Sequence, residues 1–137
     1  MPLSMIDTGG HINLIPIDFC VDSVMAIVRS GQQGVFHIVN DKKNTLRQLV
    51  DFFSRAYDIS GIHTVAGARP APSSPLEVLF DDYIKPYRPY LCDTREFDNK
   101  RAKDVVEHEG IHCPEMDYTA FKRCMDYARE DEWGSRN

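Results

Sequence analysis

The sequence lacks any apolar run approaching the roughly 20 residues that a membrane-spanning helix needs. Its first ten residues, MPLSMIDTGG, have neither a charged start nor an apolar stretch, so they do not resemble a signal peptide. Basic residues are outnumbered, with 16 Lys and Arg against 21 Asp and Glu, and they form no stripe. These absences predict a cytoplasmic chain with no membrane partner and no nucleic-acid partner.

Closely spaced cysteine pairs are also missing. The four cysteines lie far apart, at Cys20, Cys92, Cys113 and Cys124. Without a CxxC pair or a secretion signal, they are interpreted as reduced thiols. His108, His112 and Cys113 are close in sequence, but Gly110 interrupts a helix between the two histidines, so a shared face is not expected. We therefore predict no metal site and no nucleophilic cysteine.

The chain has no glycine-rich phosphate-binding turn of the GxGxxG or GxxxxGK[ST] type. The nearest pattern, Gly31–Gly34, has the wrong spacing and follows a helical pattern instead of preceding it. Tyr118 and Lys122 have the Tyr-x-x-x-Lys spacing of an acid/base pair, but Tyr118 falls on an apolar helix face and fits a core position better. No cofactor-binding or catalytic residue is therefore assigned in this chain.

Residues 11–29 change pattern from an extended apolar piece to a helix. An apolar face is predicted because Val21, Val24, Met25 and Val28 recur at helical spacing. Asp18 stands at the change and is the expected N-cap. The face is expected to be buried in the chain's core.

Residues 35–66 have the pattern of a strand, a helix and a second strand. Val35–Val39 and Ile62–Ala66 are short apolar runs. Between them, Thr45 and Gln48 fit a capping box at the start of a helix. Short links of this kind predict a parallel βαβ unit. The fold class is therefore α/β, with a small, largely parallel sheet of two or three strands packed with about five helices.

Three more helices are expected toward the C-terminus. Ser74 caps the first, and Pro86 and Pro89 end it in an extended path. Asp98 caps the second, and the third covers about residues 117–130. We expect residues 1–10 to be a flexible arm, residues 11–133 a single domain, and residues 134–137 a frayed tail.

Candidate ligand-binding residues cluster after the first of these helices. Tyr87, Arg88 and Tyr90 lie on a proline-rich stretch, where aromatic rings and a guanidinium can hold an anionic ligand. Arg95 is a weaker candidate for the same ligand-binding role. The alternative is that the tyrosines close the core. His37, within the predicted strand, is most simply a sheet histidine, with a pocket-lining role as its alternative.

Three segments together resemble one family. They are Asn13–Val28 (NLIPIDFCVDSVMAIV), Gly34–Phe53 (GVFHIVNDKKNTLRQLVDFF), and the series through Tyr90, Phe97 and Asp98. Their order and spacing are similar to the C-terminal part of extended short-chain dehydrogenase/reductases. Within these, the chain is most similar to the thioester-reductase and fatty-acyl-reductase branch and its epimerase/dehydratase-like relatives.

The resemblance implies that residues 11–133 are a substrate-binding domain, the C-terminal lobe of a Rossmann-type enzyme without the full Rossmann domain. It implies NAD(P) as the cofactor of the full-length family member, with none bound by this chain. It also implies a Rossmann domain of the same or a parent protein as partner, and a small-molecule substrate held at Tyr87, Arg88, Tyr90 and Arg95. Because the family has no catalytic pair in its last helix, that role is not transferred to Tyr118 and Lys122.

Two other functions stay open. A domain separated from its Rossmann partner exposes apolar surface around residues 11–28. This favours a non-enzymatic interaction or dimerisation module, whose partner can be a second copy of the chain in a homo-oligomer. A small complete enzyme using His37, His112 or Cys113 ranks last.

Overall fold

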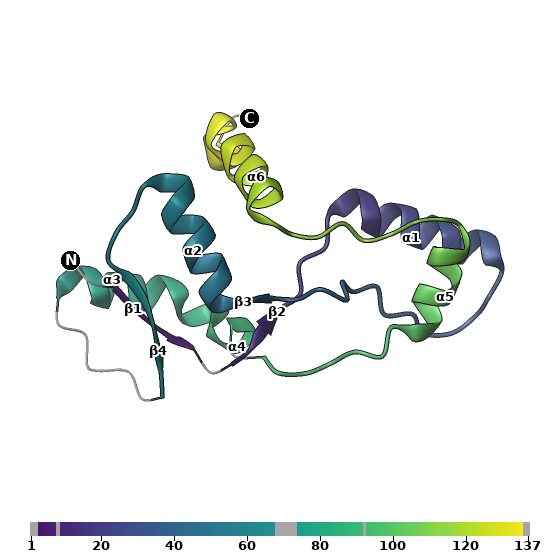
Figure 1. The fold of residues 1–137 in the computed structure, drawn as a ribbon, viewed down its shortest axis with the longest axis horizontal. Coiled ribbons are helices and arrows are strands. Elements are labelled where there is room, and N and C mark those ends of the chain that lie inside the picture. The colour runs from purple at the N-terminus through teal and green to yellow at the C-terminus, as the bar shows by residue number, and fades with distance from the viewer. Residues whose placement is uncertain (1–2, 8, 68–73, 92, 136–137) are drawn as a thin grey trace. The chain divides into compact units, whose positions relative to one another are not determined.

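The computed structural model describes residues 3–7, 9–67, 74–91 and 93–135 (Figure 1). Its residues group into two compact units. Unit 1 comprises Met1–Ile12, Asn44–Thr94 and Asp117–Asn137, and unit 2 comprises Asn13–Lys43 and Arg95–Met116. A single domain over residues 11–133 stays a prediction, because each unit is described by itself. Most of the proline-rich loop over residues 67–73, Cys92 and the last two residues of the expected tail lie outside the described residues.

Unit 1 contains a small parallel sheet. Strand β1 (Leu3–Asp7) pairs with β4 (Ile62–Ala66), so that Leu3 lies opposite Ile62 and Asp7 opposite Ala66. This confirms a mixed α/β fold with a small parallel sheet, and it confirms the strand at residues 62–66. The expected flexible arm over residues 1–10 is wrong, because five of its residues form this strand. A five-residue apolar run between glycines and a proline carries too little pattern to identify a strand whose partner lies 59 residues along the chain.

A short antiparallel bridge leads into the first helix of unit 1. Strand β2 (His11–Ile12) pairs with β3 (Asn44–Thr45), and α2 (Leu46–Tyr57) follows directly. The predicted capping box is confirmed. The Gln48 N–H donates to Thr45 Oγ1 at 3.2 Å, and the Thr45 N–H donates to Gln48 Oε1 at 2.9 Å.

Replacing Thr45 by alanine should lower the free energy of unfolding by about 1 kcal/mol, because one free N–H group of the first turn loses its acceptor. Thr45→Ser retains the hydroxyl and should lose less than half of this. Urea denaturation followed by circular dichroism measures both values. Equal losses in the two variants would mean that the Thr45 methyl group, and not the cap, matters here.

Helix α2 packs against α6 (Tyr118–Glu130), the last helix of unit 1. The Phe52 ring lies 5.9 Å from the Tyr118 ring and 5.7 Å from the Phe121 ring, between centroids. Asp117 caps α6 by accepting a hydrogen bond from the Ala120 N–H at 2.8 Å. The helix at about residues 117–130 is thus confirmed, and Tyr118 lies in an aromatic cluster.

The helix that begins at Pro75 is longer than the sequence predicts. Helix α3 (Pro75–Ile84) continues through a 3₁₀ turn, η1 (Lys85–Tyr87), into α4 (Arg88–Leu91). Ser74 caps α3 as expected, accepting from the Glu77 N–H at 3.2 Å. The prediction of an extended path through Tyr87 and Tyr90 is wrong, because both residues are helical. Pro86 and Pro89 each fall in the first residues of a new helical segment, where the missing N–H needs no partner.

Unit 2 is built on two helices in contact, α1 (Ile17–Ser30) and α5 (Lys100–His108) (Figure 1). Their buried residues are small or β-branched: Ser23 and Ala26 on α1, and Ala102, Val105 and Val106 on α5. Asp18 is not the N-cap, since the helix begins at Ile17 and Pro16 is its N-cap, two residues before the expected position. At α5, Asn99 is the N-cap, and Asp98 accepts from the Lys100 N–H at 3.0 Å.

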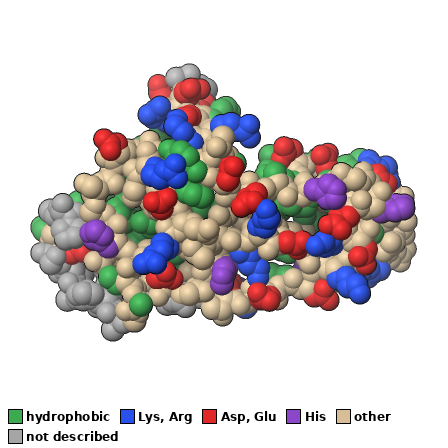
Figure 2. All heavy atoms as spheres, in the orientation of Figure 1, with side chains coloured by type: hydrophobic (Ala, Val, Ile, Leu, Met, Phe, Trp, Pro, Cys, Tyr) green, Lys and Arg blue, Asp and Glu red, His purple; other side chains and the backbone are tan. Residues whose placement is uncertain are grey.

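The apolar face predicted for α1 exists, but its burial is wrong. Its large side chains are between 45% and 79% exposed: Ile17, Val21, Val24, Met25 and Val28. Figure 2 shows hydrophobic side chains at the surface over α1, among acidic and basic ones. The helix turns its small residues toward α5, which allows the two backbones to approach closely.

Val35–Val39 forms no strand, so the predicted βαβ unit is wrong in its first strand. Val35 is 76% exposed, and no ladder partner is assigned to this stretch. Phe36 packs under the Arg101 guanidinium, whose carbon lies 4.7 Å from the ring centroid. Side-chain contacts, not a sheet, hold these residues. None of the helices in the described ranges is long and apolar enough to cross a membrane.

Candidate functional site

Two asparagines tie the separate segments of unit 2 together. The Asn13 side-chain amide donates to the Asn40 carbonyl at 2.8 Å and accepts from the Asn40 N–H at 2.9 Å. The Asn40 side chain, with the residue 2% exposed, donates to the carbonyls of Leu14 and Pro114, each at 3.2 Å. It also accepts from the Lys42 N–H at 2.9 Å. Asn40 therefore fixes the backbone on which the next residue, Asp41, is carried.

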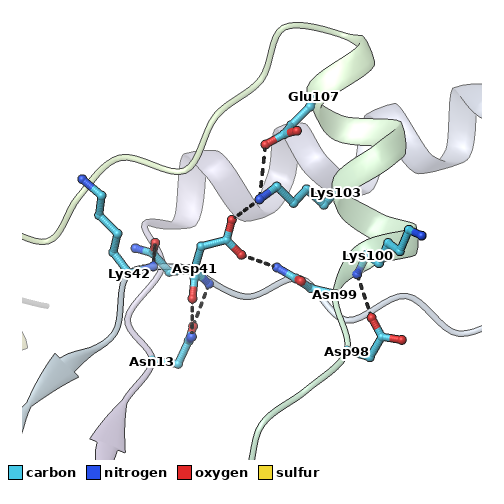
Figure 3. Close-up of polar contacts among 9 residues, drawn as sticks. Asn13, Asp41, Lys42, Asp98, Asn99, Lys100, Lys103 and Glu107 are labelled. Carbon is cyan, nitrogen blue, oxygen red and sulfur yellow. Dashed lines mark hydrogen bonds and ion pairs between the residues drawn. The ribbon is translucent and has the colours of Figure 1, made fainter.

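The Asp41 carboxylate lies at the centre of a polar cluster (Figure 3). It accepts a hydrogen bond from Asn99 Nδ2 at 2.8 Å and pairs with Lys103 Nζ. Lys103 also reaches Glu107, with 3.7 Å between Nζ and Oε1. Asn99, Lys103 and Glu107 are spaced by four residues across the start and body of α5, so they lie along one side of the helix. We call these four residues the Asp41 cluster.

The cluster shifts the protonation of its charged members. Hydrogen bonds from Lys103 and Asn99 lower the pKa of Asp41, against a smaller opposing effect of burial. The same pairing with Asp41, assisted by Glu107, raises the pKa of Lys103. Both groups are therefore held in their charged forms around neutral pH.

A lowered carboxyl pKa in the folded state stabilises the fold above the unfolded-state pKa, about 3.9, and this contribution is lost as the pH falls through the folded-state value. We expect the urea midpoint of Asp41→Asn to lie below that of the wild type at pH 7. The difference should shrink as the pH falls below about 4 and vanish once Asp41 is protonated in both the folded and the unfolded state. A difference that stays constant down to that point would mean that Asp41 acts through its shape and not its charge.

The Asp41 cluster lines a pocket of about 190 Å³ in unit 2. Its apolar wall includes Phe19, Ala102 and Val106, and Ala102 and Val106 are almost fully buried. Its lining also contains two lysines, Lys42 and Lys103, and two carboxylates, Asp41 and Glu107, so the formal charges balance. A pocket of this size accepts a ligand smaller than drug-sized molecules, whose sites occupy roughly 300–1,000 Å³.

His37 lines the same pocket, which is the alternative that the sequence left open. Its Nδ1 lies 3.0 Å from the Asp98 carbonyl oxygen, and its ring lies 5.4 Å from the Phe97 ring. A carbonyl only accepts, so Nδ1 carries a proton in this contact. The sheet role for His37 is wrong, because no sheet forms there.

Cys113 and His112 also line the pocket. Burial raises the pKa of the Cys113 thiol, and the nearby carboxylates of Asp41 and Asp18 raise it further. A thiol with a raised pKa stays protonated and is a weak nucleophile. Cys20, Cys113 and Cys124 are free thiols in the described part of the chain, where no group of three or more His, Cys, Asp or Glu is placed to hold a metal ion.

The residues predicted from sequence to bind substrate are not brought together within one unit. Tyr87, Arg88 and Tyr90 belong to η1 and α4 of unit 1, with both tyrosines more than 60% exposed, whereas Arg95 belongs to unit 2. Arg88 pairs with Asp81, with 3.2 Å between Nη2 and Oδ1. None of the four lines the pocket of the Asp41 cluster.

The Tyr118 and Lys122 side chains are engaged with other residues. The Arg55 guanidinium stacks over the Tyr118 ring at 3.8 Å from its centroid, and Lys122 Nζ lies 2.5 Å from Asp126. An acid/base pair needs the ammonium close to the phenol, where it lowers the phenol pKa. Here the ammonium is paired with a carboxylate one helical turn further along.

Sequence reasoning missed Asn40, Asp41, Asn99 and Lys103, because Asn40 and Asp41 resemble ordinary turn residues and Asn99 an ordinary helix start. Two signals were available in the sequence. Asn40 and Asp41 are short polar residues that directly follow an apolar run, and the first turn of the later helix α5 contains basic but no acidic residues. No family model, no curated protein and no solved structure matches this chain.

Proposed function

We propose that this chain is the substrate-binding, C-terminal part of an NAD(P)-dependent oxidoreductase or epimerase, similar to the thioester-reductase-like branch of extended short-chain dehydrogenase/reductases. In this proposal the dinucleotide and the catalytic residues belong to a Rossmann domain outside these residues. The chain contributes substrate recognition, and the hydride transfer takes place on the partner domain.

The observation that carries the proposal is the exposed face of α1. Isolated apolar residues are common on protein surfaces, but a continuous stripe over three helical turns is characteristic of an interface. The stripe comprises Ile17, Val21, Val24, Met25 and Val28. It lies within the segment whose resemblance to the family is strongest. A neighbouring Rossmann domain is therefore the occupant that we propose for it.

The energy available from this face favours a domain in the same polypeptide. Covering five half-exposed apolar side chains contributes roughly 4–8 kcal/mol, since complete burial of each is worth about 1.5–3 kcal/mol. Association of separate molecules loses about 4–15 kcal/mol of translational and rotational freedom. A covalently connected domain does not incur that loss, so the stripe alone suffices to hold it, whereas separately expressed pieces also need the polar contacts that surround the core of an interface.

The test begins with the reading frame upstream of the Met1 codon, where the proposal expects a glycine-rich strand–turn–helix. The encoded segment and a tagged form of this chain should co-purify when they are co-expressed. NADPH or NADH should quench intrinsic fluorescence in a saturable manner with the complex and not with this chain alone. Saturable binding of either nucleotide by this chain alone would contradict the proposal.

The double substitution Val21→Lys and Val24→Lys should reduce co-purification at least tenfold, because two charges enter the apolar contact. Val35→Lys is the matched control, since Val35 is exposed in the same unit but lies outside α1. It should co-purify as well as the wild type. Equal co-purification of the double variant and the control would exclude α1 as the docking face.

A second candidate function is a non-enzymatic interaction or dimerisation module. It is favoured by a second exposed stripe, on the continuous helical stretch of α3, η1 and α4, formed by Leu76, Leu79, Tyr83, Tyr87 and Tyr90. Tyrosines are enriched at protein interfaces. Sedimentation equilibrium distinguishes the two functions: a dimer lost in Tyr83→Lys but retained in the α1 double variant supports the module, and a monomer at all concentrations argues against it.

A further inference from the structure

Strand β4 pairs with another strand on one edge only. Within the described part of the chain its sheet contains just β1 and β4, and Leu3 lies opposite Ile62 (Figure 1). The Leu3 N–H donates to the Gly61 carbonyl at 2.6 Å, so the backbone of Gly61 faces β1. Because successive residues of a strand direct their backbone groups to alternate edges, the N–H and C=O of Ile62 face away from β1.

The same alternation continues along β4. His63 and Val65 bond to β1, whereas the backbone groups of Ile62, Thr64 and Ala66 point to the other edge, where the described residues supply no partner. We call this edge the outer edge of β4. Natural edge strands are commonly protected by charged side chains or proline, and β4 (IHTVA) contains no Lys, Arg, Asp, Glu or Pro. An unprotected edge is a template for a further strand.

A pocket of about 300 Å³ lies between β4 and α2. Ile62, His63 and Thr64 all line it. Side chains of consecutive strand residues alternate between the two faces of a sheet, so a pocket lined by three of them in a row reaches the edge of the strand. Of the described residues that line the pocket, none belongs to β1, which places the pocket at the outer edge.

The opposite wall of this pocket is one side of α2. It consists of Arg47, Val50, Asp51 and Ser54, which recur at helical spacing. From Arg47 to Ser54 the helix rises about 10 Å, the length of roughly three extended residues. A strand added to the outer edge would therefore run along α2 and place alternate side chains against it.

The charges on the α2 wall favour an acidic segment. Asp51 pairs with Arg55, with 3.8 Å between Oδ2 and Nη1. Arg47 is exposed, and no described residue pairs with its guanidinium. A carboxylate on an added strand would give this guanidinium a partner. A second copy of β4 brings none, because its five residues contain no acidic side chain.

We propose that the outer edge of β4 binds an extended acidic segment of a partner protein, which adds as a third strand of the sheet and places a carboxylate on Arg47. Main-chain hydrogen bonds to Ile62, Thr64 and Ala66 provide the affinity, and the α2 wall selects the side chains. The site lies within unit 1 and goes beyond the proposed function, since it involves neither the α1 stripe nor the pocket of the Asp41 cluster.

Amide hydrogen exchange of the ¹⁵N-labelled chain, followed by NMR, tests the free edge first. The His63 and Val65 amides should exchange slowly because they bond to β1, and the Thr64 amide should exchange at least tenfold faster. The probe is a capped seven-residue peptide in which threonine and valine alternate around one glutamate. It should bind with a dissociation constant below about 1 mM and slow the exchange of Thr64 at least tenfold. The same peptide with methylated amide nitrogens keeps its side chains but cannot donate, and it should not bind.

Thr64→Pro removes one outward N–H and no bond to β1, so it should weaken peptide binding at least tenfold while the Met5 amide of β1 stays protected. Arg47→Gln should weaken the glutamate peptide about three- to fivefold, the range of an exposed ion pair, and leave a glutamine version of the peptide unaffected. Arg123→Gln removes an exposed arginine of α6 and is the matched control, which should bind both peptides as the wild type does.

Slow exchange of Thr64 in the free chain would overturn the inference, because the edge would already be occupied. An exchange rate that falls as the chain concentration rises would assign the edge to a second copy and overturn the inference as well. So would the absence of saturation up to about 10 mM peptide, or equal binding of the methylated peptide. Where Thr64→Pro does not fold, Arg47→Gln decides: an equal loss for the glutamate and glutamine peptides, or no loss for either, would contradict the contact between Arg47 and a carboxylate.

Discussion

Asn40→Ala should destabilise unit 2 by about 2–4 kcal/mol, more than any substitution proposed at another position of this chain. The substitution removes three hydrogen bonds from a residue that is 2% exposed. It also leaves the carbonyls of Leu14 and Pro114 without their donor. A buried polar group that loses its partner costs about 1–3 kcal/mol, more than the net worth of one ordinary hydrogen bond.

Asn40→Asp sharpens the measurement, because it keeps the size of the side chain. The carboxylate still accepts from the Lys42 N–H but places a negative charge against two carbonyl oxygens. Its loss should equal or exceed that of alanine. Asn99→Ala is the control, with one exposed hydrogen bond to Asp41 and an expected loss below about 1 kcal/mol. Urea denaturation measures the free energy of unfolding of all three variants. A loss in Asn40→Ala no larger than that in Asn99→Ala would mean that the hydrogen bonds of Asn40 do not stabilise unit 2.

Ala26→Leu should lower the free energy of unfolding by about 1–3 kcal/mol. Ala26 is 0% exposed on the side of α1 that meets α5, so three added carbon atoms must displace a helix or force strained rotamers. Val24→Leu adds one carbon on the opposite side, where the residue is 45% exposed, and should change the stability by less than about 0.5 kcal/mol.

This pair of variants tests which face of α1 is buried. The helical pattern of the sequence predicts that Val24 faces the core, whereas the structure places Ala26 there. A larger loss in Val24→Leu than in Ala26→Leu, measured by thermal unfolding, would restore the orientation expected from the sequence. A larger loss in Ala26→Leu would agree with the structure, in which the valines on the other side of α1 are exposed.

Three local signals in the sequence were reliable, whereas the N-caps expected at Asp18 and Asp98 were wrong. The capping box of Thr45 and Gln48, the cap at Ser74 and the helix from Asp117 depend on residues three or four positions apart, and all three are confirmed. Hydrogen bonds of this range are determined by the segment itself. The strand at Ile62–Ala66 was likewise identified from its own composition.

Strand pairing and helix orientation, which depend on residues far apart in the sequence, were predicted less well. The partner of β4 is β1 and not Val35–Val39, and no short-range pattern distinguishes two apolar runs of five residues. The orientation of α1 depends on how closely α5 approaches, which Ser23 and Ala26 decide through their small size. The general expectation that apolar residues face inward therefore fails for the large side chains of α1.

The candidate site shows the same division. Pocket lining by His37 was one of two interpretations of its sequence position, and the structure selects it. Asp41 and Lys103 are 62 residues apart, and only the folded arrangement of unit 2 brings them together. The prolines near Tyr87 and Tyr90 were interpreted as helix breakers, although their positions in the first residues of new helical segments permit the chain to stay helical.

The order in which the chain visits the two units has a practical consequence. The polypeptide passes from one unit to the other between residues 12 and 13, 43 and 44, 94 and 95, and 116 and 117. No single cut of the gene therefore yields either unit as an uninterrupted stretch, and a fragment library of this protein should contain no autonomously folding half. Obtaining unit 2 by itself requires a new linker that joins Lys43 directly to Arg95, with both outer arms removed.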